Sequence, residues 1–206
     1  MKRTLFLFSI LFSISCFGQP LGQLTIKGDY TTQDSIQIAE AYIQARKAVG
    51  LLYQNMISIR DSRTSAEKDW IANKAFSKWL GSAESMNRSF RRIKKIHSKF
   101  NKSMTLFVTK KNRGRCTGWI SAWTLPYGQI KIKLCEDFFM YRTHLQEKVL
   151  VHEIGHETGL LSHHRIHGCR AALRAATNDP GLAKRSTENY AWLAVSYLGI
   201  ECTSPY

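Results

Sequence analysis

The chain has 206 residues, with 30 Lys or Arg against 15 Asp or Glu, so its formal net charge is +15. Its length fits one domain with a core of its own, and the absence of internal repeats and low-complexity runs excludes a repeat protein. The basic stretches at 88–102 and 110–115 carry no nucleic-acid motif. Without such a motif we expect no specific nucleic-acid partner, and the charge indicates non-specific attraction to anionic surfaces.

The first 18 residues have the features of a secretory signal peptide. Two basic residues precede an apolar run at 4–14 that is too short to span a membrane stably, and Gly18 is the small residue expected before a cleavage site. We expect 1–18 to be removed and 19–206 to form a single secreted or periplasmic domain with no transmembrane segment. The alternative is a lipoprotein acylated at Cys16, although the residues before it make a poor lipobox.

The remaining cysteines indicate disulfide bonds. Removal of Cys16 leaves Cys116, Cys135, Cys169 and Cys202, and an even number in an oxidising compartment favours two disulfides over metal thiolates. Three pairings are possible. We predict Cys116–Cys135 and Cys169–Cys202, because each pair brackets one compact segment.

Apolar residues at helical spacing predict three helices in the first half of the mature chain. After a short polar stretch at 19–34, the predicted helices cover 35–60, 66–81 and 82–96. Thr31, Thr32 and Asp34 offer N-caps for the first helix, and the third has one strongly basic face.

Three strands follow, at 104–109, 119–124 and 129–134, where apolar and polar residues alternate or β-forming residues gather. They precede a helix at 143–157. A small antiparallel sheet beside that helix would form a cleft whose edge strand can pair with an extended peptide. Two last helices are predicted at 169–177 and 186–198. The expected fold class is α+β and mostly helical.

The helix at 143–157 contains the sequence His-Glu-Ile-Gly-His. Positions four apart lie on one face of a helix, so His152 and His156 can bind one Zn²⁺ ion from the same side. Glu153 is then close enough to take a proton from a water bound to that ion. The motif predicts metal-assisted hydrolysis, although such a short motif also occurs by chance on solvated helices.

A catalytic zinc ion usually has three protein ligands and keeps one position for water. The candidates for the third ligand are His163, His164 and His167, which all follow the helix closely. The metzincin pattern fits Gly159 but requires its third histidine at Ser162. The spacing alone leaves the three histidines open.

The chain resembles the deuterolysin and lysine-specific metalloendopeptidase family, the aspzincins. That family follows H-E-x-x-H with G-T-x-x-D-x-x-Y-G, in which the Asp is the third zinc ligand and the Tyr helps to hold the oxyanion. Residues 160–168 can be placed on this motif, with His164 at the Asp position and His167 at the Tyr position. The resemblance continues at 76–81, at 128–135 and at 187–190, which look like the family's Y-x-x-W-F-G, L-C and A-D-N-Y segments.

This resemblance implies a zincin-like metalloprotease fold and a zinc-dependent endopeptidase with a protein or peptide substrate. His152, His156 and His164 would hold one Zn²⁺ ion, with His163 as the second choice for the third ligand. Exchange of the family's Asp for His164 replaces an anionic oxygen ligand by a neutral nitrogen ligand that zinc also accepts. The net charge at the metal would rise by one.

The resemblance also implies catalytic roles. Glu153 would act first as general base and then as general acid, while His167, with Tyr190, would stabilise the oxyanion. The lysine-specific members place an acidic residue where Ala191 stands, and Glu188 is the neighbouring acidic position. Lysine specificity is therefore not transferred to this chain.

Two other function classes remain open. One is a metalloprotease toxin or effector with a narrow target, and the other is a non-catalytic zinc-fold protein that binds anionic surfaces. Glu153 argues against the second class, because a structural zinc site needs no general base. We expect a monomer, and the sequence does not predict the side-chain preference or any activation step.

Overall fold

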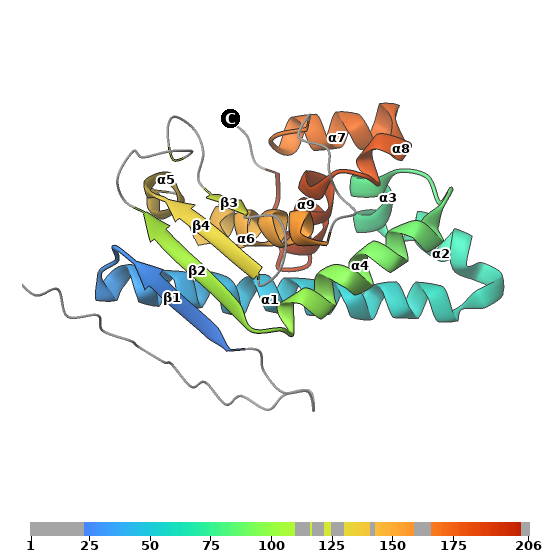
Figure 1. The fold of residues 1–206 in the computed structure, drawn as a ribbon. Coiled ribbons are helices and arrows are strands. Elements are labelled where there is room, and N and C mark those ends of the chain that lie inside the picture. The colour runs from blue at the N-terminus through green and yellow to red at the C-terminus, as the bar shows by residue number, and fades with distance from the viewer. Residues whose placement is uncertain are drawn as a thin grey trace, which may run out of the picture.

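A computed structural model describes residues 23–109, 116, 122–124, 130–140, 143–158 and 166–202 (Figure 1). The strands are β1 (Leu24–Gly28), β2 (Met104–Thr109), β3 (Ala122–Thr124) and β4 (Ile130–Cys135). The helices are α1 (Thr32–Asp61), α2 (Ala66–Ala72), α3 (Lys74–Leu80), α4 (Met86–Phe100), α5 (Glu136–Met140), α6 (Thr143–Glu157), α7 (Cys169–Asn178), α8 (Pro180–Ala183) and α9 (Thr187–Ser196), with a 3-10 turn η1 (Arg63–Ser65). The expected α+β, mostly helical class is confirmed.

The long helix α1 begins at a capping box. The side chain of Thr31 accepts a hydrogen bond from the backbone N–H of Asp34, and the Asp34 carboxylate accepts one from the backbone N–H of Thr31. Small residues such as Ala45 and Ala48 are fully buried on one face, which allows close packing against α4, α6 and α9. Figure 1 shows α1 running along the molecule, with the sheet towards one end and α2 and α3 towards the other.

The single helix predicted at 66–81 is wrong, because the chain breaks at Asn73 into α2 and α3. The Asn73 side chain accepts hydrogen bonds from the backbone N–H groups of Ala75 and Phe76, both at 3.1 Å. Such an N-cap satisfies donors that have no partner at a helix start, so it stabilises a new helix in the middle of an apolar periodic run.

The four described strands form one sheet in the order β1-β2-β4-β3. The prediction of an antiparallel sheet is wrong for two of its three pairings, because β1 pairs with β2 and β2 with β4 in parallel. β3 alone among these strands runs antiparallel, against β4. Parallel strands need a long crossover connection between them. The helices α1 to α4 form this connection between β1 and β2, since they bring the chain back to the end of the sheet at which β1 begins. β1 itself was not expected.

The buried helix α9 lies at the centre of the helical part. Every residue at 187–195 is buried, and α9 packs against α6, α1, α3 and α7. The two tryptophans Trp79 and Trp192 stack with ring centroids 5.7 Å apart, joining α3 to α9. This packing fixes α6 against an element that cannot shift without opening the core.

Both predicted disulfides are confirmed. Cys116 is bonded to Cys135 at the end of β4, with 5.4 Å between their Cα atoms. Cys169 at the start of α7 is bonded to Cys202, with 5.8 Å between Cα atoms. Among the described helices, none combines the length and the apolar character needed to cross a bilayer. The predicted signal peptide, 1–18, lies outside the described residues.

Candidate metal centre and active site

The centre of the site is the pair of imidazoles on α6, His152 and His156, here called the histidine pair. Their Nε2 atoms lie 3.0 Å apart, and the two rings meet edge to face. Two nitrogens bound to one tetrahedral zinc ion at about 2.0–2.1 Å would lie roughly 3.3 Å apart. The histidine pair therefore has the donor atoms and nearly the spacing of two ligands to one metal ion.

The carboxylate of Glu188 on α9 fixes the orientation of one member of the pair. It accepts a hydrogen bond from Nδ1 of His152 at 2.7 Å. Because this bond places the proton on Nδ1, the Nε2 atom keeps its lone pair and can bind a metal ion. The hydroxyl of Thr187 lies 3.3 Å from the same Nε2 atom. A carboxylate behind a ligand histidine is the usual outer partner of a zinc site.

Glu188 is also the centre of a wider set of contacts, here called the Glu188 network. Its side chain is 1% exposed and meets Nζ of Lys148 at 2.7 Å, the backbone N–H of Gly168 at 3.0 Å and Nε1 of Trp192 at 3.1 Å. Burial alone would raise the pKa of Glu188, but Lys148 and His152 outweigh it and hold that pKa well below its usual range. The charged carboxylate thereby joins α6, α9 and the start of α7.

Glu153 occupies a different environment from Glu188. It is 7% exposed and its carboxylate accepts a hydrogen bond from the backbone of Thr124 in the edge strand β3. Burial raises the pKa of Glu153, while His152, Lys148 and the Thr124 bond act against that rise. A carboxyl group that is costly to ionise, beside two metal-ligand candidates, has the properties of a group that accepts and returns a proton.

His167 lies on the same side of the molecule as the histidine pair. Its ring centroid is 6.4 Å from that of His152, and its side chain is exposed. The next residue, Gly168, donates its backbone N–H to Glu188 and adopts φ 80°. The Glu188 network therefore anchors the segment that carries His167.

Two candidate ligands, His163 and His164, lie outside the described residues. Within the described ranges, no group of three His, Cys, Asp or Glu side chains is arranged to hold a metal ion. The histidine pair fits two of the three ligands that a catalytic zinc ion requires. The third ligand stays a prediction for the segment at 159–165.

Tyr190 lies in the interior of the helical part. Its hydroxyl donates to the backbone carbonyl of Lys184 at 3.2 Å, and burial raises its pKa to about 12. This position holds the turn before α9 in place. The oxyanion role expected for Tyr190 stays a prediction, and in this structure its hydroxyl serves the packing of α9.

Sequence reasoning missed two residues of this site, Lys148 and Thr124, and gave Glu188 no role beside the ligands. A sequence signal for Glu188 was nevertheless present, because this acidic residue stands directly before the apolar run at 191–195 of a predicted helix. Lys148 precedes His152 by one helical turn, which is the spacing of side chains on one face. The contact of Glu153 with Thr124 depends on how β3 lies against α6, and no local pattern encodes that.

The fold is of the zincin-like class, in which a helix with His-Glu-x-x-His lies beside a small mixed sheet. Among the solved structures similar to this chain is a zinc peptidase from Grifola frondosa. It has a TM-score of 0.64 and 19% sequence identity, over 82% of this chain and 98% of that chain. No protein-family model and no curated protein matches the sequence. The similarity supports the aspzincin resemblance at the level of the fold.

Proposed function

We propose that this chain is a zinc-dependent endopeptidase that hydrolyses peptide bonds in protein substrates. One observation carries this proposal: the histidine pair, oriented by Glu188, lies beside the buried carboxyl group of Glu153 on one helix. The shared fold with a zinc peptidase supports it.

In the proposed site His152, His156 and His164 hold the zinc ion, with His163 as the alternative third ligand. When bound, zinc supplies Lewis-acid polarisation and makes water a nucleophile near neutral pH. Glu188 keeps Nε2 of His152 unprotonated and directed at the ligand position. Its buried ion pair with Lys148 stabilises this orientation.

Glu153 is the proposed general base and acid. Its carboxyl group takes a proton from the attacking water and passes it to the amine that leaves when the peptide bond breaks. Burial raises the pKa of Glu153, which makes its carboxylate a better proton acceptor than an exposed one and supports this role. His167 is the proposed donor to the oxyanion, and its exposed side chain near His152 can meet a substrate carbonyl.

The substrate is expected to be an extended peptide at the edge strand β3. This strand ends the described sheet, and its Thr124 contacts Glu153. An extended peptide that adds to such an edge would gain backbone hydrogen bonds and bring one of its carbonyl carbons next to the water that Glu153 would deprotonate. We further propose that the protein acts outside the cytoplasm as a secreted or periplasmic enzyme, and its two disulfides support this.

The test is peptide cleavage and zinc content of the wild type and of Glu153→Gln. The wild type should contain zinc and cleave peptides, whereas Glu153→Gln should keep its zinc and lose roughly 10²–10⁴-fold in activity. Glu157→Gln is a matched control, because it makes the same change one turn later on α6. Equal activity in wild type and Glu153→Gln, or no zinc in either, would reject the proposal.

A further inference from the structure

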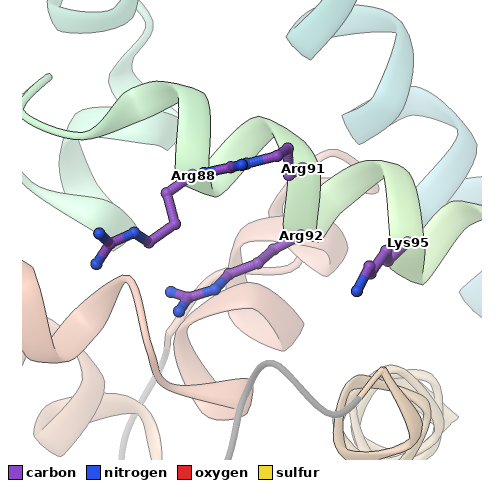
Figure 2. Close-up of a pocket in the computed structure, with 4 residues that line it drawn as sticks. All are labelled: Arg88, Arg91, Arg92 and Lys95. Carbon is purple, nitrogen blue, oxygen red and sulfur yellow. The ribbon is translucent and has the colours of Figure 1, made fainter.

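A pocket of about 390 Å³ on α4 is lined by four basic side chains, Arg88, Arg91, Arg92 and Lys95, here called the basic pocket. These positions correspond to i, i+3, i+4 and i+7, which lie along one face of a helix. Figure 2 shows Arg88, Arg92 and Lys95 extending from the same side of α4. Three of the four side chains are exposed, so a ligand can reach the pocket from solvent.

Arg92 distinguishes the basic pocket from an ordinary solvated helix face. Its side chain is 6% exposed, and among the residues that the structure describes its buried Nε and Nη1 atoms have no hydrogen-bond partner. A guanidinium group carries five N–H donors, and arginine is almost never buried without a partner. A buried charge without a partner is strongly unfavourable, which points to an anion that these donors would bind.

Among the described residues, no acidic side chain forms an ion pair with Arg92. All 15 acidic residues of the chain lie within the described ranges. Their ion pairs with described Lys or Arg residues include Arg60–Asp61, Lys99–Glu157 and Lys148–Glu188. None of these pairs involves the basic pocket. Burial lowers the pKa of Arg92; Tyr190 acts against this, while Arg88, Arg185 and Arg91 add to it.

We propose that the basic pocket binds a small, multiply charged oxyanion of the phosphate type, with Arg92 as its buried anchor. Arginine side chains bind phosphate oxygens through two parallel N–H bonds, and the exposed Arg88, Arg91 and Lys95 can close around such a group. The concave shape and limited volume suit a diphosphate or a phosphate ester. The site lies on α4, and of the residues given a catalytic role Tyr190 lies near enough to affect Arg92. The proposal rests on the four basic side chains and not on the proposed function.

The test is calorimetric titration of the full mature chain with pyrophosphate at fixed ionic strength. The wild type should bind it saturably. Arg92→Met, which keeps the apolar stem, should bind at least about tenfold more weakly because the buried donors are lost. Lys94→Gln is the control, since Lys94 is an exposed basic residue of α4 outside the pocket, and it should bind like the wild type.

If Arg92→Met does not fold, the double variant Arg88→Gln, Arg91→Gln replaces it. Its control is the double variant Lys47→Gln, Lys68→Gln, which loses the same number of positive charges. Both control residues are exposed on other helices. If Arg92→Met binds pyrophosphate as tightly as the wild type, the proposal is overturned. The pyrophosphate would then bind at another site, such as the zinc centre. Equal weakening by pocket and control variants would also overturn it.

A second titration, with long-chain polyphosphate, distinguishes two sources of the same phosphate chemistry. Binding of pyrophosphate that requires Arg92 supports a free small ligand. Binding of polyphosphate alone that requires Arg92 supports phosphate groups on a polymer. A third outcome is that pyrophosphate does not bind saturably and that Arg92→Met and Lys94→Gln weaken polyphosphate binding equally. The basic pocket would then attract polyphosphate only through its positive charge, and the proposal would be overturned.

Discussion

Glu188 connects the proposed chemistry to the protein interior. Its two oxygens meet His152, Lys148, Gly168 and Trp192, so one buried carboxylate orients a ligand and also anchors the chain before α7. A neutral amide in its place would leave Lys148 without its counter-charge. It would also weaken the hold on the His152 ring.

We therefore expect Glu188→Gln to weaken zinc binding roughly 10–100-fold, as loss of an outer-shell partner does. Stability should also fall by about 3–5 kcal/mol, because one partner of a buried ion pair is removed. Zinc affinity can be measured by competition with a chelator and stability by urea unfolding. Lys148→Met is the control that separates the two effects, since it breaks the ion pair but leaves the Glu188–His152 bond. If both variants weaken zinc equally, Glu188 affects the metal through the fold alone.

Single substitutions can identify the third zinc ligand. Of His163→Ala, His164→Ala and His167→Ala, we expect only His164→Ala to abolish zinc binding, because a site with two remaining protein ligands holds zinc far more weakly. His167→Ala should keep zinc and lose activity if His167 binds the oxyanion. Zinc content after dialysis and peptide cleavage measure the two effects. Loss of zinc in His163→Ala, with zinc retained in His164→Ala, would make His163 the ligand.

At the scale of elements, the break between α2 and α3 depends on a side chain. The side-chain Oδ1 atom of Asn73 caps α3 and accepts a further hydrogen bond from the hydroxyl of Tyr197 at 3.3 Å. Asn73→Ala should therefore cost about 1 kcal/mol in unfolding free energy, or up to about 2 with the tertiary contact. Urea unfolding measures this, and Asn87→Ala, an exposed position of α4, is the control. A loss no larger than that of Asn87→Ala would contradict a role for the cap.

The periodic elements could be predicted because their pattern is local. The helices at 35–60 and 143–157 and the strand at 104–109 agree with α1, α6 and β2 to within a few residues. β1 was missed although Leu24 to Lys27 alternate between apolar and polar residues, because the strand has only five residues. Its pairing with β2 links residues such as Leu24 and Met104 that are far apart in the chain. The prediction of strand direction was wrong for the same reason, because the direction in which two strands pair depends on the path of the helices between them.

The whole molecule should lose stability at high pH through its buried tyrosines. Burial raises the pKa of Tyr190 to about 12, above an unfolded value near 10. The neutral phenol is favoured in the fold, so this contribution is complete below pH 10 and is lost as pH rises to 12. At pH 11 the loss is about 1.4 kcal/mol for this residue. Urea unfolding at pH 9 and 11 should show a smaller drop in Tyr190→Phe than in wild type, and an equal drop would contradict this assignment.

The sequence by itself determined which side chains the candidate centre places together on one helix, and it predicted the disulfide pairing. His152, Glu153 and His156 lie within one turn of one helix, and local spacing is sufficient to bring such groups together. Only the tertiary structure decided what surrounds them, because Glu188 reaches His152 from α9 and Thr124 reaches Glu153 from β3. It also decided that Arg92 is buried with two guanidinium nitrogens that have no hydrogen-bond partner among the described residues. These contacts join residues distant in the chain, so they follow from the packing of whole elements, which no local pattern records.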